Sequence, residues 1–235
     1  MANRPIYIPN FSGPLLVKTI SVEFKWFPGM AVSQKQKSIV SLHQAAQRAI
    51  PCIDNILEVS SKSQNELGVA LSAFNLMIKT IKYNRAFSVE QAFQSSKVFE
   101  NGGPYIDLLE KTSREAKKDP RLKNSGKLKS FRFCGVDWSL TPQTAFYDWL
   151  YINALKKQPE FSDQVINYSA FTDIEFNPNK SINCQAYSVA LFVSLKRRVL
   201  LDKALSTKED FLETLRNSIV NNARQDDTKQ PSFNF

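Results

Sequence analysis

The chain has 235 residues, of which 43% are hydrophobic and 23% charged, and its formal net charge is +9 at pH 7. This length suits one well-buried domain, and no stretch approaches the roughly 20 apolar residues that a membrane-spanning helix needs. Three scattered cysteines without a C-x-x-C spacing and a single histidine argue against a disulfide framework, a structural zinc site and a Ser-His or Cys-His nucleophile. With no signal-peptide core at the N-terminus, we expect a cytoplasmic protein without a metal or cofactor and without contact to a membrane.

The first 54 residues are expected to form a strand and a helix that extend a core domain. Alternating apolar and polar residues predict a strand over residues 20–26, and a turn follows at Pro28-Gly29. A helical stripe then runs from Ser33 to Ile50. His43 lies on or beside this apolar stripe, so we interpret it as a packed histidine rather than a catalytic one.

Two short strands, over residues 55–60 and 77–82, lead into the most informative stretch, which runs from residue 88 to residue 97. Interpreted as a helix, this stretch places Glu90, Gln94 and Lys97 at i, i+4 and i+7, so that all three project from one face.

Ser88 and Gln91 have the spacing of a capping box, which puts the Glu90 carboxylate in the first turn. A carboxylate, an amide and an amine in one line suit a polar substrate. They are equally the composition of a solvated helix face, and spacing alone leaves both interpretations open.

The remainder of the chain is predicted to be mainly helical. We expect helices over residues 104–111, 113–119, 141–157 and 184–204, and a final amphipathic helix that Ser206 or Thr207 caps. A short strand is expected over residues 171–176, and residues 121–134 are expected to be a polar, basic loop. From Gln225 the last eleven residues are expected to be disordered. The predicted fold is therefore α+β, mainly helical, with a small sheet.

Positive charge is concentrated between residues 111 and 132. Nine lysines and arginines stand there against two acidic residues, a net charge of +7 in 22 residues. Such a cluster suits phosphate, either a pyrophosphate or a nucleic-acid backbone. A basic loop without a partner is the alternative that the composition leaves open.

Five motifs, which follow one another along the chain in the order typical of the family, resemble the signature of the NADAR family over roughly residues 55–195. The stretch Glu90-x-x-x-Gln-x-x-Lys97 is similar to the family's signature helix, and Ser113-Arg-Glu-Ala-Lys117, ending near Arg121, resembles its Ser-Pro-x-x-Ala-Lys-x-x-Gly-Arg segment. The other similar stretches are Glu58-Val-Ser-Ser with Leu71-Ser-Ala-Phe-Asn75, Asp137-Trp138, and Trp149-Leu-Tyr-Ile-Asn-Ala-Leu-Lys156 followed by Pro159-Glu-Phe.

The resemblance implies a YbiA-like N-glycosidase fold and chemistry on NAD or ADP-ribose. It is closest to the branch found beside DarT-type toxins, which ADP-ribosylate guanine bases in DNA. It therefore implies a hydrolase that removes ADP-ribose from DNA as an antitoxin, with ADP-ribosylated DNA as substrate, ADP-ribose as product and the cognate toxin as a partner. The implied organisation is an N-terminal extension over residues 1–54, a NADAR-like core over 55–204, a C-terminal helix over 205–224 and a tail over 225–235.

The resemblance also implies roles for individual residues. Glu90 would stabilise positive charge on the ribose or activate water, and Lys97 would either neutralise pyrophosphate or act as an amine nucleophile. Trp138 would stack on a base, or would be a simple core residue. The remaining implied substrate-binding residues are Gln94 for the ribose hydroxyls, Lys117 and Arg121 for the phosphates, and Asn75.

Two departures from the family pattern leave other functions open. Gln91 replaces the family's histidine after the glutamate, and the late Asp-x-x-Trp-Gly motif is missing, with Asn179, Asn183 and Gln185 as the only local polar candidates. The alternatives are a binding module that neutralises a toxin without catalysis, and a small-molecule N-glycosidase of riboflavin-pathway intermediates.

Overall fold

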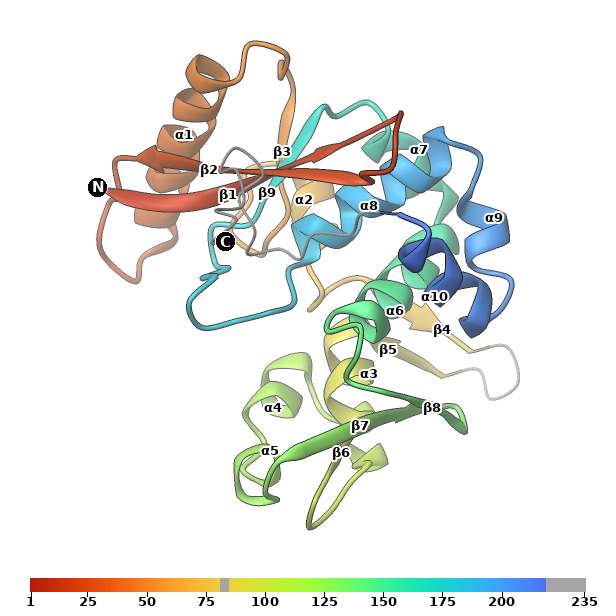
Figure 1. Cartoon of the computed structure of the whole chain (residues 1–235). Helices are drawn as coiled ribbons and strands as arrows, with labels where there is room; N and C mark the ends of the chain where they lie inside the picture. The colour runs from red at the N-terminus through yellow and green to blue at the C-terminus, as the bar shows by residue number, and fades with distance from the viewer. Residues whose placement is uncertain (81–84, 219–235) are drawn as a thin grey trace, which may run out of the picture.

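The computed structural model describes residues 1–80 and 85–218, and it has a mixed α and β fold (Figure 1). Within these residues the strands form three small sheets. The end of the strand predicted over 77–82, the last part of the predicted C-terminal helix and the predicted tail over 225–235 lie outside the described residues. No helix in the described part combines the length and apolar character that a membrane span requires.

The largest sheet has the strand order β2-β1-β9-β3 and joins the N-terminal segment to the rest of the chain. The strands β1 (Ala2–Pro9) and β2 (Val17–Phe24) form an antiparallel hairpin, whereas β3 (Ile56–Glu58) runs parallel to β9 (Ala170–Thr172). Helix α1 (Val32–Ala49) covers one face with Ile39, Leu42 and Ala46, which confirms the predicted helix and its apolar stripe. The first 54 residues thus share a sheet with the predicted core.

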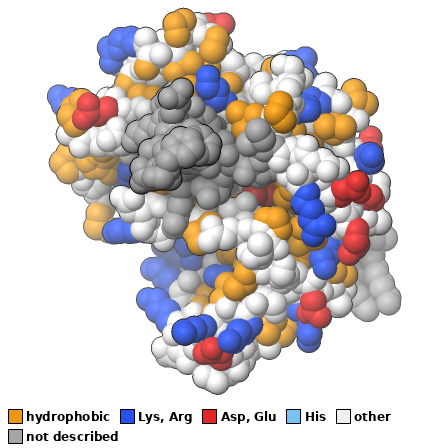
Figure 2. All heavy atoms as spheres, viewed as in Figure 1, with side chains coloured by type: hydrophobic (Ala, Val, Ile, Leu, Met, Phe, Trp, Pro, Cys, Tyr) orange, Lys and Arg blue, Asp and Glu red, His pale blue; other side chains and the backbone are white. Residues whose placement is uncertain are grey.

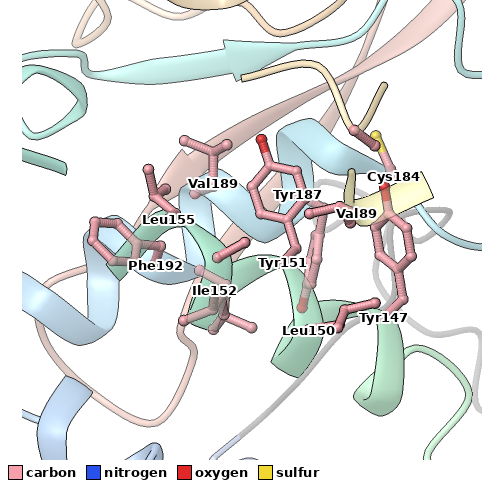
Figure 3. Packing of buried hydrophobic residues seen from close by; sticks show 14 of the residues in the cluster. Val89, Tyr147, Leu150, Tyr151, Ile152, Leu155, Cys184, Tyr187, Val189 and Phe192 are labelled. Carbon is pink, nitrogen blue, oxygen red and sulfur yellow. The ribbon is translucent and has the colours of Figure 1, made fainter. Parts of the chain in front are cut away.

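Two almost fully buried helices form the centre of the molecule. Helix α6 (Ala145–Lys156) packs against α8 (Gln185–Arg197), and α8 also packs on β1 and β9. Figure 3 shows Tyr147, Tyr151 and Leu155 of α6 beside Tyr187 and Phe192 of α8. Helices α7 (Pro159–Val165), α9 (Leu201–Ala204) and α10 (Lys208–Arg216) surround this core, and Thr207 caps α10 as predicted.

The candidate site lies on α3 (Val89–Ser95), between the central helices and the sheet β6-β7-β8 (Figure 1). Here β4 (Met77–Lys79) and β5 (Ala86–Ser88) form a hairpin that leads into α3. Next comes the sheet β6-β7-β8, formed by β6 (Lys97–Phe99), β7 (Leu128–Phe133) and β8 (Val136–Trp138). Between β6 and β7 stand η1 (Ile106–Glu110), α4 (Ser113–Lys118) and α5 (Arg121–Asn124), while α2 (Glu66–Ala70) precedes β4.

Several predicted elements are corrected. Residues 121–134 are not a loop, because α5 and β7 occupy most of this segment. In β7 the apolar residues Leu128, Phe131 and Phe133 alternate imperfectly with exposed basic residues, so the strand resembles a polar segment in sequence. The helix predicted over 184–204 is interrupted after α8, where Val199 has a φ of +57°. Strand β1 was not predicted, since prolines at positions 5 and 9 oppose a strand assignment.

Candidate active site around Glu90

Glu90 lies in the first turn of α3, and backbone contacts hold this turn in place. Ser88 accepts a hydrogen bond from the Gln91 backbone, and the Gln91 side chain accepts one from the Ser88 backbone, so the predicted capping box is confirmed. The Glu90 N–H donates to the Ala73 carbonyl over 2.9 Å. Only 5% of the Glu90 surface is exposed. A buried carboxylate is therefore fixed at the start of a short helix.

One oxygen of Glu90 has two polar neighbours. Gln94 donates from Nε2 to Glu90 Oε1 over 2.9 Å, and Lys117 Nζ lies 3.6 Å from the same oxygen. Lys117 also lies over the Phe74 ring, 4.9 Å from its centroid. Among the described residues nothing donates to Glu90 Oε2, and Gln94 Oε1 is buried without a partner. Two acceptor oxygens of the site therefore have no partner among the described residues.

Lys97 is not on the same helix as Glu90, which corrects the predicted i+7 arrangement. Helix α3 ends at Ser95, and Lys97 begins β6, where it pairs with Phe131. It nevertheless belongs to the same cluster. Burial lowers the pKa of Lys97 to about 8, the charge of Glu90 opposes this shift, and Lys117 adds to it. Its Nζ lies 4.8 Å from the centroid of the Phe93 ring. Close to neutral pH a fraction of this amine is therefore uncharged.

Arg121 does not lie free for a phosphate. Its guanidinium binds Asp107 over 2.6 and 3.1 Å and Asp119 over 2.8 and 3.0 Å, and it stacks on Tyr105. Lys111 binds Asp119 as well, over 2.7 Å. Hydrogen bonds from Arg121 hold the pKa of Asp119 well below its usual range. This network fastens η1 to α4 and α5, so the structure gives Arg121 a structural contact instead of the predicted phosphate contact.

Trp138 and Asn75 also lie apart from the Glu90 cluster. Trp138 is 2% exposed and packs against Phe146 and Trp149, with ring centroids 5.6 and 5.1 Å away, which leaves its faces inaccessible to a base. The Asn75 side chain donates to the Val69 carbonyl over 2.8 Å and lines a separate cavity of about 590 Å³. Of the predicted site residues, the structure therefore brings together Glu90, Gln94, Lys97 and Lys117.

Gln185, one of the three polar candidates near the missing late motif, supports the Glu90 turn through hydrogen bonds to neighbouring backbone groups. Its Oε1 accepts from the Ala73 N–H over 2.7 Å, and its Nε2 donates to the Val59 carbonyl over 2.6 Å. Because the carbonyl of the same Ala73 holds the Glu90 N–H, Gln185 connects α8 and the end of β3 to the Glu90 turn. The other two differ: Asn183 Oδ1 is buried without a partner among the described residues, and the Asn179 N–H binds the Asn177 side chain.

Two further contacts near Glu90 were missed from the sequence. Tyr147 is buried beside the cluster, its ring 5.1 Å from that of Phe93, and burial followed by the charge of Glu90 raises its pKa. Ser113 donates to the Phe74 carbonyl over 2.9 Å and is 2.8 Å from the Ser88 hydroxyl. Tyr147 stands within the predicted helix over residues 141–157 and Ser113 at the start of the predicted helix over residues 113–119, so neither position signalled proximity to Glu90.

A second polar cluster occupies the carboxyl ends of the parallel strands β3 and β9. Buried Glu58 accepts hydrogen bonds from Ser60, Thr172 and the Ile174 N–H over 2.6–2.8 Å. His43 Nε2 is 2.8 Å from the Thr172 hydroxyl, and burial lowers the pKa of His43 to about 4. His43 is thus a neutral packed residue, in line with the prediction.

The same cluster includes Asp173, whose pKa is raised to about 8 by burial and by the charge of Glu58. No group of three or more His, Cys, Asp or Glu side chains within residues 1–80 and 85–218 has an arrangement suited to a metal ion.

Comparison with known proteins gives one family. A family model described as DarT1-associated NADAR antitoxin matches residues 2–225. The match includes residues 2–54 as well as the region that carries the motifs. No curated protein matches the chain.

Proposed function

Since the chain belongs to the family of DarT1-associated NADAR antitoxins, we propose that it is a hydrolase that removes ADP-ribose from guanine bases in DNA. The observation that carries this proposal is the cluster around Glu90. A buried carboxylate with one unoccupied oxygen stands beside an amide, a cation and a partly neutral amine. A fixed carboxylate can stabilise the positive charge that develops on a ribose as its bond to nitrogen breaks.

The proposed reaction breaks the bond between the anomeric carbon of the ribose and a guanine nitrogen. Positive charge develops on the ribose as this bond lengthens, as in glycosidases. The Glu90 carboxylate, fixed by its helix turn, stabilises this charge or accepts a proton from the attacking water. The water oxygen joins the anomeric carbon, and the guanine nitrogen retains the bonding pair and takes up a proton, so that free ADP-ribose and unmodified guanine are released.

Gln94 and Lys117 orient the carboxylate in this scheme. Both contact Glu90 Oε1, which leaves Oε2 for the substrate. Gln94 Oε1 can accept a hydrogen bond from a ribose hydroxyl, since none of the described residues occupies it. The Lys117 side chain is 55% exposed, and the pyrophosphate contact that the family resemblance implies would compete with its contact to Glu90.

Lys97 has two possible roles, and its pKa of about 8 is compatible with both. At pH 7 about nine in ten molecules carry the charged amine, which would neutralise pyrophosphate. The remaining tenth carries a neutral amine, which could attack the anomeric carbon of the ring-opened sugar. The guanine nitrogen would leave with its bonding pair and a proton, and water would hydrolyse the resulting lysine imine to free ADP-ribose and the unmodified amine.

A binding antitoxin that neutralises the toxin without catalysis is the second candidate. The observation in its favour is the missing Asp-x-x-Trp-Gly motif between residues 179 and 185.

The test is to incubate the purified protein with a DNA oligonucleotide that carries ADP-ribosylated guanine and to measure the oligonucleotide mass. Wild type should remove the ADP-ribose mass, and Glu90→Gln should not, because it is nearly isosteric but lacks the negative charge. Glu115→Gln is the matched control, since Glu115 is exposed and contacts Thr112 on the outer side of α4. Turnover by Glu90→Gln would refute the assignment of Glu90. No turnover by wild type would favour the binding antitoxin.

A further inference from the structure

The basic segment between residues 111 and 132 contains two kinds of cation. Five of its nine lysines and arginines have a carboxylate partner: Lys111, Lys117, Arg121, Lys129 and Arg132. The other four, which we call the open cations, form no ion pair within the described part of the chain. The open cations are Arg114, Lys118, Lys123 and Lys127, and all four are exposed.

The open cations lie on consecutive elements of one region. Arg114 and Lys118 are four residues apart on α4 and therefore share a face of the helix. Lys123 belongs to α5, and Lys127 directly precedes β7. Figure 2 shows Lys and Arg side chains gathered over the lower part of the molecule, where Figure 1 places α4 and α5. The open cations thus lie on successive elements between the start of α4 and the start of β7.

This region adjoins the candidate active site. Helix α4 packs against α3, and Lys117, which lies between Arg114 and Lys118 in sequence, reaches the Glu90 carboxylate. A polymer bound along α4 and α5 would therefore pass close to Glu90.

The chemistry of the surface favours a phosphate backbone over a protein. Ion-paired cations are already neutralised by their partners, so the open cations carry the charge that is available to a ligand. No large hydrophobic side chain between residues 111 and 128 is exposed, whereas protein interfaces have an apolar centre. Exposed lysines and arginines without such a centre are typical of contacts with nucleic-acid phosphates.

We propose that the four open cations bind the phosphate backbone of the DNA strand next to its ADP-ribosylated guanine, and so lead the adduct to Glu90. The proposal rests on the proposed function, because it takes modified DNA as the substrate. It adds the surface that holds the strand outside the site of bond cleavage. It also separates these contacts from Arg121, which the sequence grouped with the phosphate-binding residues.

The size of the effect follows from counterion release. Each phosphate contact with a single strand contributes about 0.7 to the slope of log affinity against log salt concentration. Four contacts predict a slope of about −2.8, which means a loss of about 50-fold in affinity between 50 and 200 mM salt. Removing two of the four should reduce the slope by about 1.4.

The experiment is fluorescence anisotropy of the full chain with an unmodified single-stranded DNA oligonucleotide at several salt concentrations. The test variant is Lys118→Gln with Lys123→Gln, and the control is Lys129→Gln with Arg132→Gln. Both double variants remove two positive charges, but the control removes cations that Glu100 and Asp137 already hold. The test variant should reduce the salt slope by about 1.4, whereas the control should leave it close to that of wild type.

Equal slopes for both double variants would overturn the proposal, because they would show that only the net charge of the protein matters. A flat salt response of wild type would overturn it as well. If DNA binding is unaffected but the test variant no longer binds the purified DarT-type toxin, the surface contacts an acidic protein instead. Binding to unmodified DNA requires no turnover, so these outcomes are independent of whether wild type removes ADP-ribose from the modified oligonucleotide.

Discussion

Replacing Gln185 tests how the molecule holds its candidate carboxylate. Gln185 makes two short hydrogen bonds to backbone groups of buried residues, the Ala73 N–H and the Val59 carbonyl. Gln185→Ala removes both partners at once. Because the Ala73 carbonyl holds the Glu90 N–H, the substitution should loosen the turn that carries Glu90.

The expected magnitude follows from the two groups that lose their partners. A buried backbone donor or acceptor left without a hydrogen bond costs about 1–3 kcal/mol, so the free energy of unfolding should fall by about 2–6 kcal/mol. For a protein of this size, 1 kcal/mol corresponds to about 2–4 °C in melting temperature. We therefore expect Gln185→Ala to melt at least about 4 °C below wild type.

The assay combines thermal unfolding with hydrolysis of the modified oligonucleotide. Gln185→Met keeps most of the side-chain volume and should lower the melting temperature nearly as much as Gln185→Ala, since the hydrogen bonds matter and not the volume. Gln44→Ala is the control, because Gln44 is exposed on α1. In Gln185→Ala kcat should fall more than KM rises, since DNA contacts on α4 remain. A melting temperature equal to that of wild type would refute this account of Gln185.

Three further predictions concern Lys97 and Arg121. Lys97→Met should abolish turnover yet raise the melting temperature at pH 7, because burial disfavours the charged amine of the wild type. The pKa of Lys97 is about 8 in the folded chain and 10.5 in the unfolded chain, so the unfolded chain binds more protons between these values. Wild-type stability therefore rises from pH 8 to pH 10.5, and the stability advantage of the variant should shrink over this range. A pH profile separates the two roles of Lys97: a nucleophilic amine predicts turnover that rises about tenfold from pH 7 to a plateau above pH 9, whereas a charged amine predicts a decrease through pH 8. Arg121→Ala should lower the melting temperature, because Asp107 and Asp119 lose one of their two cationic partners and keep only Lys111. The salt slope of DNA binding should stay at the wild-type value, and a reduced slope would show that Arg121 contacts phosphate after all.

The parts of the fold that the sequence predicted are those with strong local signals. The stripe on α1, the capping box of α3 and the cap of α10 each depend on residues within one or two turns. Elements whose local signals conflict were missed. Prolines weaken the pattern of β1, and basic residues on the exposed side of β7 hide its apolar side.

Contacts among the site residues could likewise be predicted only where they depend on neighbouring positions in the sequence. Glu90 and Gln94 are one turn apart on one helix, so their contact could be predicted from spacing. Lys97 lies two residues beyond the end of that helix. The sequence prediction continued the helical spacing past Ser95 and so placed Lys97 on the helix, whereas it belongs to strand β6. The contacts of Gln185 join residues more than one hundred positions apart, and no local pattern encodes them.

The pairing of charges shows most clearly why the sequence alone could not identify the cations that are available to a phosphate. A count over residues 111–132 gives a net charge of +7, but four of the carboxylates that neutralise this segment lie outside it: Glu90, Glu100, Asp107 and Asp137. The count therefore treats Arg121 and Lys123 alike, although one binds two carboxylates and the other none among the described residues. Because a phosphate competes with any partner that a cation already has, the cations that folding leaves unpaired are those most available to a phosphate. On α4 and α5 those are Arg114, Lys118 and Lys123, the residues to which we assign the contacts with a DNA strand.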